Sequence, residues 1–360
     1  MNHLGGTIMK LTTKALIGAA LLGLGATIAQ ANADDLTVFD WSGYEDQGFY
    51  GAYVAKYGGA PSYTYFGSVE EAFTKLQSGF EADLAHPCTD SIRKWVAADL
   101  IAPIDTSRLT NWDKLLPQIK DVDGVIINGK TYMVPFEWGN TGLIYRTDMV
   151  NADDISLQMM ADPAYQGKVA IPDAATSSYA LAALATGASS YTHMSDEEFQ
   201  KASDFLRRLH KNIRFYWSDA GQLDQALASG EVTMGWGWNQ SELNLIWNET
   251  PAAMMRDTDK GIATWVCGYV ILKSATQSEE QIYDMLNALS DEASGKYIIE
   301  SWGYAHSNAD AFNSADQDLI KIYGFADLDS FFANSLFFDA VEPTLEGKML
   351  KEYERIKSGF

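Results

Sequence analysis

The stretch Asp35-Leu-Thr-Val-Phe-Asp-Trp-Ser-Gly-Tyr44 places an apolar strand directly before a polar turn that carries two aromatic residues. Downstream, the residue pattern predicts a second strand over residues 62–66, a helix over 68–77 and a short third strand over 82–85. A further helix is expected over residues 91–98. Strands that alternate with helices are typical of α/β proteins with parallel sheets, so the sequence predicts an α/β fold.

The same alternation continues through the rest of the chain. Further strands are predicted at residues 168–172, 232–238 and 265–272. Further helices are predicted at residues 46–57, 177–186, 197–211, 281–289, 316–322 and 346–357. The chain is long for a single core, and it contains no repeat or flexible linker. We therefore expect two lobes joined by ordered crossovers, the first of them near residues 132–138.

The N-terminal residues have the pattern of an export signal. Residues 1–33 contain no Asp or Glu, and Lys10 and Lys14 precede an apolar run over residues 15–28. Small residues then flank Gln30 and Asn32, as at a signal-peptide cleavage site. The alternative is an uncleaved anchor, but the apolar run is shorter than the ~20 residues of a membrane-spanning helix. We predict a cleaved signal peptide over residues 1–33 and a periplasmic location.

The amino-acid composition and the absence of known motifs limit the classes of function that the chain can have. The chain carries 26 basic and 48 acidic residues, a net charge of −22, which argues against nucleic acid and anionic membranes as partners. This charge favours cationic ligands, although solubility alone also explains it. The sequence lacks the motifs of serine hydrolases, zinc proteases and phosphate-binding loops, and its histidines have no close metal-ligand spacing. We therefore expect neither an enzyme nor a metal or cofactor site.

Six segments, in order along the chain, carry a family resemblance. They are residues 36–44, 82–89, 101–111, 134–142, 230–239 and 353–359. Together they resemble the periplasmic spermidine/putrescine-binding proteins of ABC importers. The resemblance implies a two-lobe type II periplasmic binding-protein fold, in which each lobe is a mixed, mostly parallel sheet flanked by helices, with two hinge crossovers. The implied lobes are residues 34–140 plus 267–311 and residues 141–266 plus 312–360. A monomer that delivers its ligand to a membrane permease is expected.

Aromatic residues at strand ends and crossovers are the main ligand candidates. Rings near the ends of strands are placed to attract cations, although any one of them can instead be core. Five rings match ligand residues of the family: Trp41, Tyr44, Trp238, Trp265 and Tyr304. Neighbouring positions complete the predicted site: Thr89, Asp90, Glu137, Trp138, Ser177, Trp236 and Cys267.

The carboxylates that bind the ligand in this family are not matched in this sequence. Ala174, Ser177 and Cys267 stand where polyamine binders have acids, so Glu137, Asp90 and Asp173 are the candidates to replace them. The expected ligand is a small cationic amine of the polyamine type. A quaternary ammonium or a betaine-like zwitterion is the alternative, since an aromatic cage with few acids suits it. The zwitterion's carboxylate would need a donor from the set Ser177, Ser178, Asn140, Thr141 and Arg214. A ligand-presenting sensor would share the fold.

The implied fold also predicts where the only two cysteines lie relative to each other. In the type II fold the strand after the second crossover lies antiparallel beside the third strand. Cys88 ends the third strand and Cys267 begins the returning one. We therefore predict a Cys88–Cys267 disulfide in the ligand site, with two buried thiols as the alternative.

Overall fold

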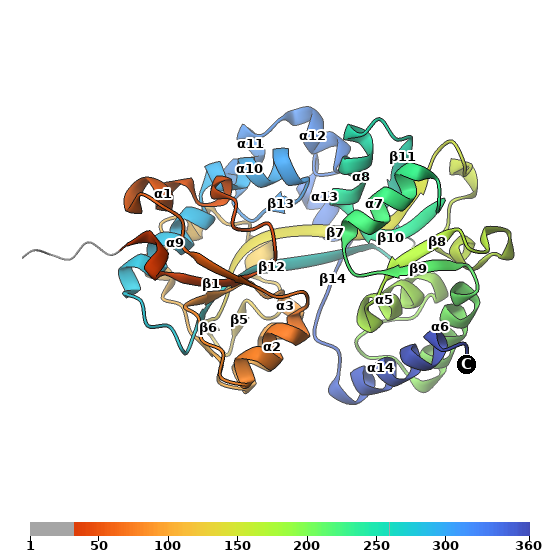
Figure 1. Cartoon of the computed structure of the whole chain (residues 1–360), viewed down its shortest axis with the longest axis horizontal. Coiled ribbons are helices and arrows are strands. Elements are labelled where there is room, and N and C mark those ends of the chain that lie inside the picture. Colours follow the sequence, from red (N-terminus) through yellow and green to blue (C-terminus); the bar gives the residue numbers. More distant parts are fainter. Residues whose placement is uncertain (1–31, 259) are drawn as a thin grey trace, which may run out of the picture. The chain divides into compact units, whose positions relative to one another are not determined.

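The computed structural model describes residues 32–258 and 260–360 (Figure 1). The predicted signal peptide lies outside these described residues, apart from its last two positions, and stays a prediction. No helix within the described ranges combines the length and the apolar character that a membrane crossing requires.

Twelve strands in the described part form one mixed sheet, and β5 and β6 pair separately. The order along the sheet is β2-β1-β3-β12-β7-β10-β8-β9, with β4, β11, β13 and β14 joined at its sides. The strands are β1 (Thr37–Asp40), β2 (Ser62–Tyr65), β3 (Leu84–Ala85), β4 (Ile101–Ala102), β5 (Ile126–Ile127), β6 (Lys130–Thr131), β7 (Val134–Arg146), β8 (Val169–Pro172), β9 (Ile213–Trp217), β10 (Met234–Trp238), β11 (Ala252–Met255), β12 (Ile262–Leu272), β13 (Ala305–His306) and β14 (Ser335–Phe337).

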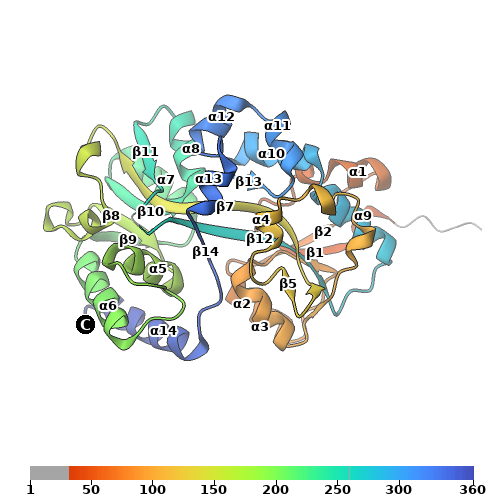
Figure 2. The same ribbon diagram turned by 180° about the vertical axis from the view of Figure 1, so that it is seen from behind.

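Two long buried strands, β7 and β12, run antiparallel to each other through the middle of this sheet (Figures 1 and 2). The first half of the chain adds β1, β2 and β3, which pair in parallel, and β3 lies antiparallel to the far end of β12. At the other end, β10 pairs antiparallel with β7 and parallel with β8, and β8 pairs in parallel with β9. The predicted α/β fold with a mixed sheet is confirmed.

Helices flank the sheet along its length. The α-helices are α1 (Gly51–Tyr57), α2 (Val69–Gln77), α3 (Thr89–Ala97), α4 (Pro117–Lys120), α5 (Ala175–Thr186), α6 (Asp196–His210), α7 (Ala220–Ser229), α8 (Asn239–Trp247), α9 (Glu279–Leu289), α10 (Glu292–Trp302), α11 (Ala309–Ser314), α12 (Gln317–Ile322), α13 (Leu328–Ala333) and α14 (Pro343–Lys357). Short 3-10 turns lie at Ala33–Asp35, Gln47–Phe49, Thr106–Arg108, Trp112–Lys114, Ala152–Asp154, Leu157–Ala161 and Pro163–Tyr165.

Local sequence explains several of these boundaries. The Ser68 side chain accepts a hydrogen bond from the backbone of the first turn of α2, and Ser195 with Glu198 forms a capping box at α6. The predicted helix at residues 46–57 is instead split into a 3-10 turn and α1. The sequence pattern missed β9, α7 and α8. The helix α8 follows β10 directly, so no turn residue marks its start. Only Ser218 and Asp219 separate β9 from α7, and Asp219 caps that helix.

Buried side chains form separate groups at the two ends of the sheet. The first group covers β1, β3, the start of β7 and the end of β12, together with α9, α10 and α13. The other groups surround β8 and β10, where α5, α6 and α14 pack together. Residues 312–331, which we assigned to the second lobe, contribute side chains to the first group.

Candidate ligand-binding site

One face of the sheet carries the central predicted ligand residues. Successive side chains of a strand point to opposite faces, and residues paired across strands share a face. Glu137 and Gly139 of β7 are paired with Cys267 and Trp265 of β12. Two residues further along β7, the pairing partner is Trp238 of β10. The sheet therefore brings a carboxylate, the cysteine and two tryptophans to one face.

Glu137 is a buried carboxylate whose side chain is only partly satisfied. It is 2% exposed, and the Tyr44 hydroxyl donates a hydrogen bond to its Oε1 atom. Its Oε2 atom has no hydrogen-bond partner among residues 32–258 and 260–360. Burial raises the pKa of Glu137 to about 7, against the opposing effects of His86 and of the Tyr44 hydrogen bond. A buried, half-satisfied carboxylate is costly unless a donor or a cation meets it.

His86 and Asp40 extend the polar network around the Glu137 carboxylate. The His86 Nε2 atom lies 3.9 Å from Glu137 Oε1, and its Nδ1 atom lies 2.8 Å from Asp40 Oδ1. The Tyr269 hydroxyl donates to the other Asp40 oxygen at 2.8 Å. The Trp41 indole nitrogen donates to the His86 carbonyl at 2.9 Å, which places this predicted ligand ring beside the same network.

Trp265 and Tyr304 form an aromatic pair close to Glu137. Their rings are perpendicular, with centroids 4.8 Å apart. The Trp265 ring lies over Gly139, where any β-carbon would collide with it, so glycine is required at that position. The Tyr304 hydroxyl donates to Gln240 at 3.0 Å. The Trp265 indole nitrogen has no protein partner within the part of the chain that the structure describes.

The other three predicted tryptophan rings near the crossovers differ in their surroundings. Trp238 is 36% exposed and packs edge-on against Trp217, with ring centroids 5.2 Å apart. Trp236 is buried in the apolar group beside β8. Trp138 is buried on the opposite face of β7 from Glu137, against phenylalanine rings of residues 312–332. Trp236 and Trp138 therefore pack as core, and of these three rings we propose only Trp238 as a ligand residue.

Thr89 and Asp90 begin α3 in a more acidic environment. Burial raises the pKa of Asp90 to about 7, and the nearby Glu70 carboxylate adds to this effect. The Asp90 Oδ1 atom has no partner among the described residues. The Thr89 hydroxyl donates to the Phe338 carbonyl at 3.4 Å. Asp90 is thus a half-buried acid with one buried, unpartnered oxygen, and none of the described hydrogen bonds or ring contacts joins it to the Trp265–Tyr304 pair.

Three other candidate residues, all in the predicted second lobe, lie apart from the sheet face that carries Glu137. Asp173 forms an ion pair with Lys357 at 2.5 Å, and Arg214 forms one with Glu231 at 2.8 Å. Both charges are therefore already paired. Ser177 lies half-buried in the first turn of α5.

The predicted Cys88–Cys267 disulfide is present. The two residues are opposite each other in an antiparallel bridge, with Cα atoms 3.8 Å apart. The antiparallel pairing of β12 with β3, on which this prediction depended, is also confirmed. Since Cys267 is oxidised, its side chain supplies no charge. The crosslink instead ties the strand that faces Glu137 to the start of α3.

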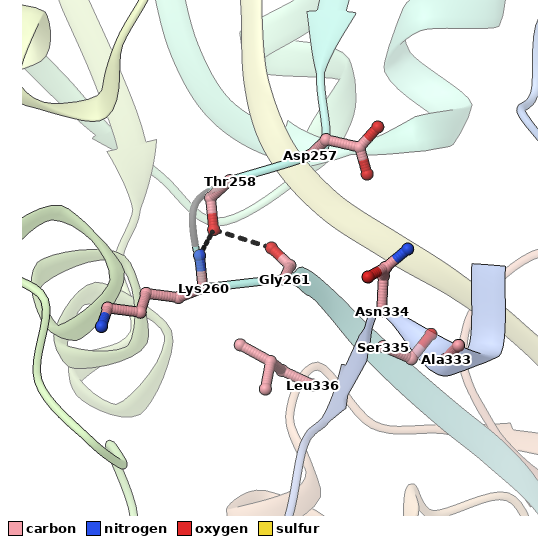
Figure 3. Close-up of a pocket in the computed structure, with 8 residues that line it drawn as sticks. All are labelled: Asp257, Thr258, Lys260, Gly261, Ala333, Asn334, Ser335 and Leu336. Carbon is pink, nitrogen blue, oxygen red and sulfur yellow. Dashed lines mark hydrogen bonds between the residues drawn. The ribbon is translucent and has the colours of Figure 1, made fainter. Parts of the chain in front are cut away.

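A pocket of about 380 Å³ lies away from the predicted residues (Figure 3). It is lined by Asp257, Thr258, Lys260, Gly261, Ala333, Asn334, Ser335 and Leu336. The Thr258 hydroxyl donates to the Gly261 carbonyl and accepts from the Lys260 amide, so its hydrogen bonds are satisfied locally. No predicted ligand residue lines it. Across the described ranges, no three His, Cys, Asp or Glu side chains are grouped to hold a metal ion.

Sequence reasoning missed the residues that hold Glu137 in place. His86 was not among the predicted ligand residues. Asp40 ends the apolar strand β1. An acid in such a strand could have indicated a functional network from the sequence alone, because a buried charge needs partners. Asp224 on α7 was missed together with its helix.

The mixed α/β sheet places a buried carboxylate near an aromatic pair, a setting that suits a small cation. The family model of bacterial extracellular solute-binding proteins matches residues 52–321, and the chain belongs to this family. It is therefore a solute-binding protein and not an enzyme, and the family resemblance stated from the sequence is confirmed.

Individual relatives agree with this assignment. The spermidine/putrescine-binding periplasmic protein of Escherichia coli is 27% identical over 306 residues, covering 83% of this chain and 85% of the relative. The protein of the same description from Salmonella typhimurium is 26% identical over 304 residues, with the same coverage of both chains. The solved structure of the spermidine/putrescine ABC transporter substrate-binding protein PotD from Streptococcus pneumoniae shares the fold, with a TM-score of 0.76, 20% identity, and coverage of 90% of this chain and 98% of that one.

Proposed function

We propose that this chain captures a small cationic amine of the polyamine class in the periplasm and delivers it to the permease of an ABC importer. The observation that carries the proposal is the buried Glu137 carboxylate, whose Oε2 atom has no protein partner in the described ranges and lies near the Trp265–Tyr304 pair. An ammonium group supplies both the charge and the hydrogen bond that this oxygen needs. The spermidine and putrescine named for the relatives have such groups.

Capture proceeds by closure of two lobes in this proposal. The lobes are residues 34–140 plus 267–311 and residues 141–266 plus 312–360, joined at β7 and β12. A ligand that contacts both lobes shifts the equilibrium towards the closed form, which the permease then recognises. The disulfide crosslinks the returning strand to the first lobe, so the closing motion is confined to the crossovers.

The Glu137 carboxylate also favours a simple amine over a betaine-like zwitterion. A zwitterion brings its own carboxylate, which the charged Glu137 repels. Arg214 is paired with Glu231, so the other candidate donors for that carboxylate are neutral: Asn140, Thr141, Ser177 and Ser178, of which Asn140, Thr141 and Ser178 have unpartnered side-chain atoms in the described ranges. A quaternary ammonium would satisfy the charge of Glu137 but has no N–H to donate. Primary and secondary amines satisfy both requirements.

A thermal-shift screen tests the proposal. We expect putrescine and spermidine at saturating concentrations to raise the melting temperature by a few degrees, while glycine betaine and choline do not, since ligand at 100 times its Kd stabilises the folded state by about 2.7 kcal/mol. Glu137→Gln should abolish the shift. Glu81→Gln, which removes the same charge from an exposed position, should keep it. A shift with betaine alone would contradict the proposal.

A further inference from the structure

A second carboxylate with an oxygen that lacks a formed hydrogen bond lies on a helix that the family resemblance did not indicate. Asp224 lies on α7, which packs against α8 and β10. Asn244 of α8 donates a hydrogen bond to Asp224 Oδ2 at 2.8 Å. The other oxygen, Oδ1, is buried and has no hydrogen-bond partner among the residues that the structure describes. Asp224 thus resembles Glu137 in having one oxygen held by the protein and one without a formed hydrogen bond, although the Ser241 hydroxyl lies beside its carboxylate.

A short chain of contacts connects Asp224 to the aromatic pair. Asn244 and Gln240 are four residues apart on α8 and therefore share a face of that helix. Gln240 accepts the hydrogen bond of Tyr304, and Tyr304 packs on Trp265. The start of α8 thus contacts both the carboxylate and the ring.

Both acids act on the pKa of the Tyr304 hydroxyl. Its pKa is raised well above the ordinary value, first by burial and then by the negative charges of Glu137 and Asp224, in that order. Burial also raises the pKa of Asp224, although Ser241 and Asn244 beside it oppose the shift. Tyr304 is therefore within electrostatic reach of both carboxylates.

We propose that Glu137 and Asp224 hold the two ammonium groups of a diamine, with its carbon chain against Trp265 and Tyr304. This inference rests on the proposed function and adds its selectivity, because a molecule with two separated positive charges satisfies both unpaired oxygens and a monoamine satisfies one. Asp224 thereby takes the place of the second-half acids that are missing at Ala174 and Ser177. The rival for this role is Asp90, whose neighbours are other carboxylates and not the aromatic pair.

Calorimetric titration with two matched ligands tests this assignment. Putrescine carries two ammonium groups, and N-acetylputrescine keeps the carbon chain but only one of them. Wild-type protein should bind putrescine more tightly. Asp224→Asn keeps the size of the side chain and should weaken putrescine binding about 10- to 100-fold while leaving N-acetylputrescine unchanged, since a hydrogen bond to a charged group is lost. Asp113→Asn, at an exposed position, is the matched control and should bind like wild type.

The outcomes separate this inference from the proposed function. Wild-type affinity for putrescine in Asp224→Asn overturns the role of Asp224, and so does an equal loss for both ligands. A loss in Asp90→Asn that is selective for putrescine, with Asp224→Asn unaffected, moves the second contact to α3. If wild-type protein binds none of the amines, the proposed function itself fails.

Discussion

The two carboxylates of the proposed site are held in opposite ways. Glu137 lies on a long buried strand, accepts a hydrogen bond from Tyr44 and is paired with a disulfide-bonded cysteine. Asp224 lies half-buried on a helix and is held by the amide of Asn244. The strand fixes its carboxylate before ligand arrives, whereas the helix leaves its own more room to adjust. From this difference we expect Glu137 to govern the affinity for any amine and Asp224 the preference for diamines.

Removing the crosslink behind Glu137 should have the largest effect on the protein. The bridge spans 179 residues of sequence, and loss of a disulfide typically lowers the free energy of unfolding by about 2–5 kcal/mol. We expect the Cys88→Ser/Cys267→Ser double variant to melt well below wild type and to bind amine more weakly, since the strand facing Glu137 is no longer tied to α3. Differential scanning calorimetry with and without reductant measures this. An unchanged melting temperature would show that pairing of β12 with β3 holds this end without the bridge.

The Trp265 ring packs on Tyr304, which is within electrostatic reach of both carboxylates, so its loss should affect both ends together. Trp265→Ala removes the face on which the carbon chain rests and should weaken putrescine binding by about 3 kcal/mol, more than 100-fold. Trp265→Phe should restore part of the affinity. Trp247→Ala, which removes an exposed ring, serves as the control. Equal affinities for the Trp265→Ala variant and wild type in calorimetric titrations would refute an aromatic contact.

The pH dependence of amine binding should report the protonation of the buried Glu137 carboxylate. Because the pKa of Glu137 is raised to about 7, the free protein is mostly protonated there below pH 7, and an ammonium ligand must displace that proton. Affinity should therefore rise with pH by up to about tenfold per unit below pH 7 and level off above it. Titrations between pH 5.5 and 8 measure the slope. Glu137→Gln should flatten it, and a slope that survives this substitution would assign the proton to another acid, such as Asp90.

The smallest expected effect belongs to the hydroxyl that holds Glu137. Tyr44→Phe removes a donor that favours the charged carboxylate, so the pKa of Glu137 should rise further. Amine affinity at pH 7 should fall by about fivefold, close to 1 kcal/mol. Tyr65→Phe, at an exposed ring, should leave affinity unchanged. A gain in affinity for Tyr44→Phe would mean that the hydroxyl competes with the ligand for this oxygen.

The same contrast explains how far the sequence could predict the site. Glu137 was predicted from a short segment shared with a family, and Trp265 and the disulfide from the family's fold, which fixes which strand ends are neighbours. Trp138 and Trp236 were predicted as ligand residues from their positions at a crossover and at a strand end, which do not reveal how the rings are covered. Trp138 lies on the face of β7 opposite Glu137, whereas Trp236 shares the face of Trp238 but is buried in the apolar group beside β8. Asp224 could not be predicted, because an acid on a short amphipathic helix usually faces solvent and only the packing of α7 on α8 buries it.

The structure of the protein crystallised with putrescine tests the central claim most directly. We expect one ammonium nitrogen within hydrogen-bond distance of Glu137 Oε2, the carbon chain against the Trp265 ring, and the other nitrogen at Asp224 Oδ1. Putrescine bound instead in the pocket between Asp257 and Leu336, or beside Asp90 without contact to Glu137, would contradict the account.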